Sequence, residues 1–199
     1  MCLTGVLATA SARAEDESPA PDLPQLAEPQ RIVYGVGVVS EAPLAAGSLC
    51  RDDATCILGS GVGILARAAL ATSHWADLGV AYSLTRQNSA RLYRLATLQQ
   101  LRMEGRYTFA TGRTVEPFVA ASAGVAGYGN EWGLDTWAPT ASLGAGALFE
   151  LDKDTFVSAE IDYRVMRFAE FADQTGRVRL PAIVHMLGLR LTLEARGKL

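Results

Sequence analysis

The chain has 199 residues, 49% of them apolar, and a formal net charge of −3 at pH 7. This length predicts one domain with a sizeable core, and the charge provides no basic field, which excludes a nucleic-acid binder. No charge-free apolar run reaches the roughly 18 residues of a membrane helix, so a helical membrane protein is excluded. A membrane β-barrel is not excluded, because the hydrophobic signal of each of its strands is much weaker than that of a membrane helix.

The first 30 residues differ in composition from the rest. Residues 1–14, MCLTGVLATASARA, are a short apolar run that ends in a small-x-small pattern, Ala12-Arg13-Ala14. That pattern is typical of a secretory cleavage site and predicts a signal peptide, which lacks the usual basic start. Residues 15–30 hold four prolines and five acidic residues, which predicts an extended linker.

From Arg31 onward, apolar and polar residues alternate with a period of two. The clearest case is 155–168, where Val157 and Ile161 share one face while Glu160 and Arg164 share the other. A strand separates two such sets and a helix mixes them. Seven further segments alternate in the same way: 32–39, 61–70, 77–84, 100–107, 116–125, 142–150 and 186–194.

The connections between these segments alternate between long and short. Long ones are predicted at 40–58, 85–94, 129–138 and 169–180, and short ones at 71–75, 110–114 and 152–154. An up-and-down barrel with turns at one rim and loops at the other has this order of lengths. The sequence therefore predicts an all-β fold over 31–196: an eight-stranded antiparallel up-and-down barrel, with both termini at the short-turn rim.

The polar face of these strands indicates which side points inward. It carries charges of both signs among Gly, Ala and Ser, which suits a narrow lumen better than a solvated surface. Because charges in such a lumen must pair, they predict a plug, with a narrow ion path as the alternative. The expected lumen residues are Arg67, Arg102, Glu104, Arg106, Glu116, Glu160, Asp162, Arg164 and Arg190.

Aromatic residues gather near the predicted strand ends, as at the two interfaces of a bilayer. Towards the short-turn rim we expect Tyr34, Trp75, Phe109, Phe149 and Phe156. Towards the loop rim we expect Tyr82, Tyr93, Tyr128, Trp132, Trp137, Phe168 and Phe171. These belts favour a transmembrane barrel. The alternative is a soluble lipocalin-like carrier, which would place the apolar face inside.

In topology and patterning, residues 31–196 resemble the small OmpA/OmpX-like outer-membrane barrels. The closing strand, 186–193, resembles their C-terminal assembly signal through Gly188, Leu191 and Leu193. The resemblance implies a monomer in the outer membrane of a diderm bacterium, with periplasmic termini. It also implies contact with outer-membrane lipid and lipopolysaccharide, and with the barrel-insertion machinery during assembly.

Two cysteines, Cys50 and Cys56, lie within the first long connection. In an exported protein this spacing predicts a disulfide that staples the loop, and two free thiols are the alternative. A metal site would need more ligands than the neighbouring Asp52 and Asp53. No metal or cofactor site is therefore predicted.

Evidence for catalysis is weak. His74 falls in a short turn and His185 on the outward face of the last strand, so neither points into the lumen. Outer-membrane lipid A deacylases resemble this chain in size, but their His-x-Ser motif is absent, because Met186 and Leu187 follow His185. The sequence predicts a non-enzymatic barrel with a structural or surface-interaction role. The alternatives are a small pore or ligand-binding barrel, and a lipid-modifying enzyme.

A cluster of arginines in the second predicted loop leaves two interpretations open. Arg86, Arg91 and Arg94 are suited to contact lipopolysaccharide phosphate, because the guanidinium fork matches phosphate geometry. A merely solvated loop explains the same residues equally well.

Overall fold

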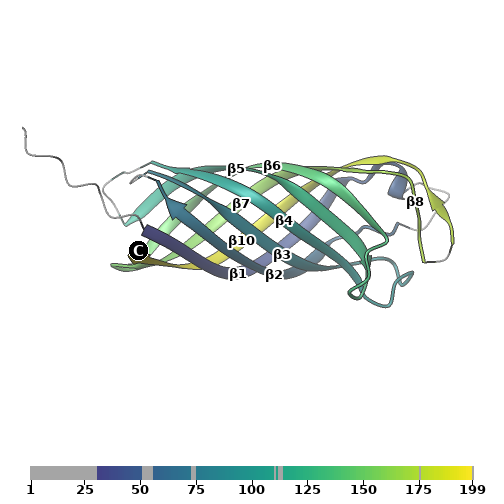
Figure 1. Ribbon diagram of the computed structural model, residues 1–199, viewed down its shortest axis with the longest axis horizontal. Helices are drawn as coiled ribbons and strands as arrows, with labels where there is room; N and C mark the ends of the chain where they lie inside the picture. Colours follow the sequence, from purple (N-terminus) through teal and green to yellow (C-terminus); the bar gives the residue numbers. More distant parts are fainter. Residues whose placement is uncertain are drawn as a thin grey trace, which may run out of the picture.

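The computed structural model describes residues 31–50, 56–72, 75–109, 111, 114–174 and 176–198. Eight long strands form one closed antiparallel barrel in the order β1-β10-β7-β6-β5-β4-β3-β2, which confirms the predicted fold (Figure 1). Their bounds are β1 Arg31–Ala45, β2 Gly61–Ala71, β3 Ala76–Gln87, β4 Ala96–Thr108, β5 Val115–Asn130, β6 Thr136–Asp152, β7 Thr155–Phe168 and β10 Ala182–Lys198. The predicted signal peptide and linker lie outside the described residues.

The barrel closes between its first and last strands. β1 pairs with β10 from Arg31 opposite Lys198 to Ala45 opposite His185. The start of β1 and the end of β10 therefore share one rim, together with the short β2–β3, β4–β5 and β6–β7 connections. We call this end the turn rim and the opposite end the loop rim; they lie at the left and right of Figure 1.

The strands extend further towards the loop rim than the sequence predicted. The segment from Ser40 to Ala45, assigned to the first loop, continues β1 and pairs with β10. A 3-10 helix, η1 (Gly47–Cys50), follows it, and two short strands, β8 (Phe171–Ala172) and β9 (Val178–Arg179), form a hairpin in the last connection. None of the described segments forms a helix long and apolar enough to cross a membrane.

Burial is inverted relative to a soluble protein, as predicted. On β7 and β10 the outward apolar side chains Ile161, Leu189 and Leu191 are 57%, 56% and 50% exposed, and Val157 is half-buried. The alternate residues that face the lumen are buried: Arg102, Glu160, Arg164 and Arg190. A surface with this much exposed apolar area is stable in contact with lipid and not in water.

The aromatic belts are only partly as predicted. Six of the expected residues are exposed near a rim, Tyr34, Trp75, Phe109, Phe149, Trp132 and Trp137, and Tyr82 is exposed in the middle of β3. The other five are buried, so the prediction was wrong for Tyr93, Tyr128, Phe156, Phe168 and Phe171. For the three that lie in long strands, the reason is their phase. Phe156 and Phe168 alternate in step with the inward Glu160 and Arg164, and Tyr128 is in step with the inward Ser122.

Candidate functional site

Three layers of side chains fill the lumen. Between an apolar plug at the loop rim and a small apolar cluster at the turn rim lies a charged layer. We define this charged layer as Glu41, Arg67, Asp77, Arg102, Glu104, Arg106, Glu160, Asp162, Arg164, Arg190 and Glu194. The eight-strand circumference brings these side chains within reach of one another.

Arg190 is the central cation of the charged layer. Its guanidinium lies 2.7 Å from Glu104 Oε2, 2.6 Å from Glu160 Oε1 and 3.2 Å from Asp162 Oδ1. Arg190 is on β10 and Glu104 on β4, and three strands separate these two in either direction around the barrel. This ion pair therefore crosses the lumen from wall to wall.

Two arginines continue the layer towards the turn rim. Arg67 Nε donates to Glu104 Oε1 at 2.8 Å, and Arg67 also pairs with Asp77. Arg106 Nη2 donates to Glu194 Oε1 at 2.9 Å, again from β4 to β10 across the lumen. Glu104 thus joins Arg67 to Arg190, so these groups belong to one connected network.

Towards the loop rim, Arg164 organises a polar group around Glu41. Its Nη2 donates to Asp162 Oδ2 at 2.7 Å, and its Nη1 donates to Glu41 and to Gln100 Oε1. The Glu41 carboxylate also accepts from Gln100 Nε2 at 2.8 Å, and from Thr85 Oγ1 and Gln87 Nε2 at 2.9 Å each. With so many donors, the oxygens of this buried carboxylate are fully hydrogen-bonded.

The structure brings together seven of the nine residues expected in the lumen network, all except Arg102 and Glu116. Arg102 is 1% exposed, but none of its side-chain nitrogens has a hydrogen-bond partner within the described part of the chain. Glu116 is half-buried at the turn rim, where it lines a hollow of about 220 Å³ with Lys153 and Arg196.

Three acids were missing from the expected network: Glu41 and Glu194, which are buried, and Asp77, which is partly buried. Asp77 and Glu194 lie on the polar face of their strands. This alternation was the sequence signal by which they could have been included. Glu41 was missed because β1 was expected to end before it. With these three included, every carboxylate of the charged layer has an arginine nitrogen within 4.0 Å.

Glycines beside the charged layer make room for its carboxylates. A Cβ atom added at Gly188 would collide with the Asp162 carboxylate, and one at Gly144 with the Glu160 carboxylate. Asp162 is paired opposite both glycines, on β6 and β10. The glycines therefore leave space in the wall for acids that bridge to Arg164 and Arg190.

We expect Gly188→Ala to lower the free energy of unfolding by about 1–3 kcal/mol, because Asp162 must move away from its two arginines. Urea titration of the folded barrel in bilayers measures this difference. Gly105→Ala is the matched control, since its added methyl meets only Leu78 Cδ1, at 3.8 Å. Similar small changes in both variants would contradict the close fit at Asp162.

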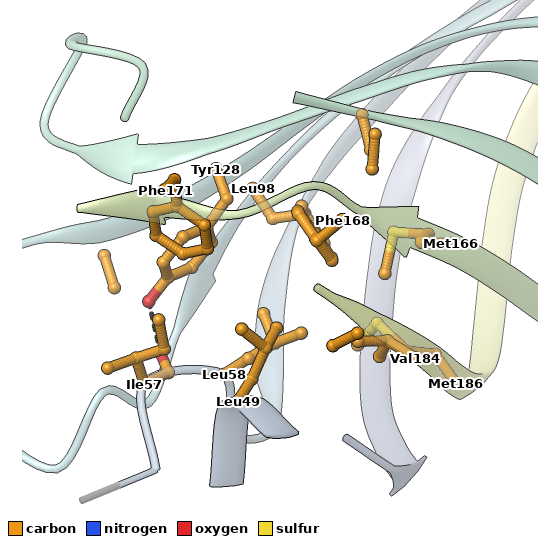
Figure 2. Packing of buried hydrophobic residues seen from close by; sticks show 14 of the residues in the cluster. Leu49, Ile57, Leu58, Leu98, Tyr128, Met166, Phe168, Phe171, Val184 and Met186 are labelled. Atoms are coloured by element: carbon orange, nitrogen blue, oxygen red, sulfur yellow. Dashed lines mark hydrogen bonds between the residues drawn. The ribbon is translucent and has the colours of Figure 1, made fainter. Parts of the chain in front are cut away.

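The plug at the loop rim is apolar and comes from both the wall and the loops (Figure 2). Leu49, Ile57 and Leu58 belong to the connection between β1 and β2 and are at most 1% exposed. They pack against inward wall residues such as Leu98, Tyr128, Met166, Phe168, Val184 and Met186. The Tyr128 hydroxyl donates to the carbonyl of Ile57, which anchors the loop to β5 (Figure 2).

Tyr93, in the β3–β4 connection, completes the plug. Its ring meets that of Tyr128 edge-on, with centroids 5.6 Å apart. Burial, together with the nearby Asp135 carboxylate, raises the pKa of the Tyr93 hydroxyl. The phenol is therefore neutral at physiological pH, as an apolar plug requires.

Cys50 and Cys56 form the predicted disulfide. It ties the end of η1 to the segment that carries Ile57 and Leu58, so it holds the plug residues of the first connection together. Replacing both cysteines by serine is expected to lower the free energy of unfolding by about 2 kcal/mol at most, because the ring is small. Mass spectrometry of non-reduced peptides tests the bond itself, and two free thiols would contradict it.

At the turn rim a small apolar cluster closes the lumen. It consists of Phe118, Ala120, Leu148 and Phe156. The Arg106 guanidinium lies 4.8 Å from the Phe118 ring centroid, and that of Arg196 lies 4.0 Å from the Phe156 centroid. These cation–π contacts join the cluster to the charged groups next to it.

Of the two histidines, His185 lies among the described residues. His185 lies on the outer side of β10, with Nδ1 2.5 Å from the Tyr163 hydroxyl of β7. The two rings are stacked, with centroids 5.8 Å apart. His74 lies outside the described residues.

The sequence matches no protein-family model and no curated protein. Solved structures do resemble the fold. Neisserial surface protein A superimposes with a TM-score of 0.54 at 16% identity, covering 83% of this chain and 96% of that one. The outer membrane protein OprG from Pseudomonas aeruginosa gives 0.52 at 12% identity, covering 86% and 97%. The attachment invasion locus protein Ail of Yersinia pestis gives 0.50 at 12% identity, covering 85% and 99%. The fold is that of the small OmpA/OmpX-like transmembrane β-barrels.

Proposed function

We propose that this protein is a non-catalytic β-barrel of the outer membrane of a diderm bacterium, with a sealed lumen. The observation that carries the proposal is the cross-lumen pairing of Arg190 with Glu104 and of Arg106 with Glu194. Ion pairs between opposite walls occupy the space that a conducting path would need. The apolar plug and the turn-rim cluster close the two ends.

The exterior supports a role in the membrane itself. Its outward apolar side chains require lipid, and the fold is shared with outer-membrane proteins of other bacteria. In this proposal the turn rim, with both strand termini, faces the periplasm, and the loop rim faces outward. The barrel acts as a monomer with a structural or surface-interaction role, and the barrel-insertion machinery assembles it through its closing strand.

Single-channel recording in planar bilayers tests the sealed lumen. The purified, refolded protein is expected to give no discrete conductance steps, because the charged layer leaves no continuous water path. Arg190→Met is the matched variant for the same recording, because it removes the central ion bridge across the lumen. Regular steps from the unmodified protein would instead establish a small pore.

A further inference from the structure

At the loop rim lies a hollow of about 670 Å³, lined by residues of β2, β3 and the β3–β4 connection. Three arginines line it, Arg86, Arg91 and Arg94. Further lining comes from Ser40, Ser60, Asn88 and Ser89, and from Gln87 and Tyr93, whose side chains are buried towards the lumen. No carboxylate is among these described lining residues, so the hollow combines positive charge with hydroxyl and amide groups of Ser40, Ser60 and Asn88.

The position of Arg86 places the hollow at the edge of the apolar exterior. Arg86 is on the outward face of β3, in a cross-strand row with Val62 and Ser40. On these three strands the next outward row towards the turn rim is apolar and consists of Val38, Ile64 and Leu84. On β1, β2 and β3, Arg86 thus brings the first outward charge next to an apolar surface, as at the level where acyl chains give way to lipid headgroups.

The connection that carries the other two arginines is held in a defined conformation. Asn88 exchanges backbone hydrogen bonds with Gly59 and Ser60, both at 2.8 Å, and the Tyr93 N–H donates to Ser89 Oγ at 3.2 Å. Arg91 has a φ of 69°, an unusual value for a non-glycine residue. The loop therefore presents its guanidinium groups from a fixed backbone.

One of the three arginines has a carboxylate partner among the described residues. Arg94 lies 3.0 Å from a Glu131 oxygen, although its side chain is 86% exposed. Arg86 and Arg91 have no ion pair with any carboxylate in the described part of the chain. Two guanidinium groups are thus available to an anion, and guanidinium forks bind phosphate in a bidentate manner.

We propose that this hollow binds the phosphate groups of a phosphorylated glycolipid of the outer leaflet, such as lipid A. Its acyl chains lie along the apolar row of Val38, Ile64 and Leu84, and its phosphates meet Arg86 and Arg91. This inference rests on the proposed outer-membrane location. It adds a specific lipid site to a barrel whose lumen is closed.

Native mass spectrometry of the protein released from detergent tests the site, with lipid A as the probe. We expect Arg86→Gln combined with Arg91→Gln to weaken lipid A binding by at least about tenfold, because two charge-assisted contacts are lost. The control combines Arg167→Gln with Arg177→Gln, two exposed arginines near the loop rim that do not line the hollow, and should bind as the unmodified protein does. Inorganic phosphate, added as a competitor at millimolar concentration, is expected to displace little lipid.

Equal binding by the two double variants would overturn the proposal, since the attraction would then depend only on overall charge. Full displacement by inorganic phosphate would also overturn it, and would identify a site for free anions. Either result is distinguishable from failure of the membrane proposal, because folding into vesicles of phosphatidylcholine is measured on the same samples. Both variants are expected to fold there.

Discussion

Replacing Arg190 by methionine is expected to lower the free energy of unfolding by about 3–5 kcal/mol, because Glu104, Glu160 and Asp162 would lose a shared counterion in a buried site. The Arg190 side chain is 3% exposed, so water does not screen the remaining charges. Methionine keeps much of the side-chain length, which limits the contribution of lost packing. The loss should be measured by urea titration in lipid vesicles.

Arg94→Met is the matched control for this prediction. Arg94 also forms an ion pair, with Glu131, but its side chain is 86% exposed and the pair is screened by water. Its replacement should leave the unfolding midpoint nearly unchanged. Equal, small losses in the two variants would show that the charged layer is hydrated, and the pore alternative would then explain the lumen better.

The second large effect is expected on the outer face of β10. Leu191→Arg should lower the free energy of unfolding in bilayers by about 2–4 kcal/mol, because an arginine near the midplane must lie in hydrocarbon. Ile183→Arg on the same strand should cost about 1 kcal/mol or less, since Ile183 lies close to the loop rim. Both leucine and isoleucine are about half exposed, so packing losses are similar. Equal effects at the two depths would contradict a lipid-facing strand.

The sequence was sufficient to predict the barrel and the facing of its strands, because the period of two continues through each long strand. Val157 and Ile161 alternate with Glu160 and Arg164, and no other regular structure separates them so fully. The order of long and short connections then fixed the antiparallel neighbours. These two signals are local, so a single sequence contains them.

The loop-rim plug was not predicted, although its phase was visible. Tyr128 and Phe168 follow the inward phase of β5 and β7, whereas aromatic residues near strand ends usually face lipid, which favours an interface position. In this barrel the inward face changes from charged to apolar near the loop rim. Leu49, Ile57 and Leu58 lie outside the strands, and their packing depends on tertiary contacts that periodicity does not report.

The sequence predicts a lumen with paired charges, but it does not predict which residues form the pairs. Glu41 lies within 40–58, which the sequence predicts as a long connection, so the acid that binds Arg164 is not expected in the lumen. The pairing of Arg190 with Glu104 depends on which strands lie opposite, and on their stagger around the barrel. Register across a lumen is a global property, which strand-by-strand alternation does not contain.

Spin-label accessibility in lipid bilayers tests the inverted barrel most directly. Labels are attached at cysteines that replace the outward Leu187, Leu189 and Leu191, and at cysteines that replace the inward Ser142 and Ser158. The outward labels are expected to be relaxed by oxygen, which dissolves in lipid, and little by a water-soluble nickel complex. The inward labels should be protected from both. Outward labels relaxed mainly by the nickel complex, together with inward labels reached by oxygen, would contradict the membrane-spanning barrel.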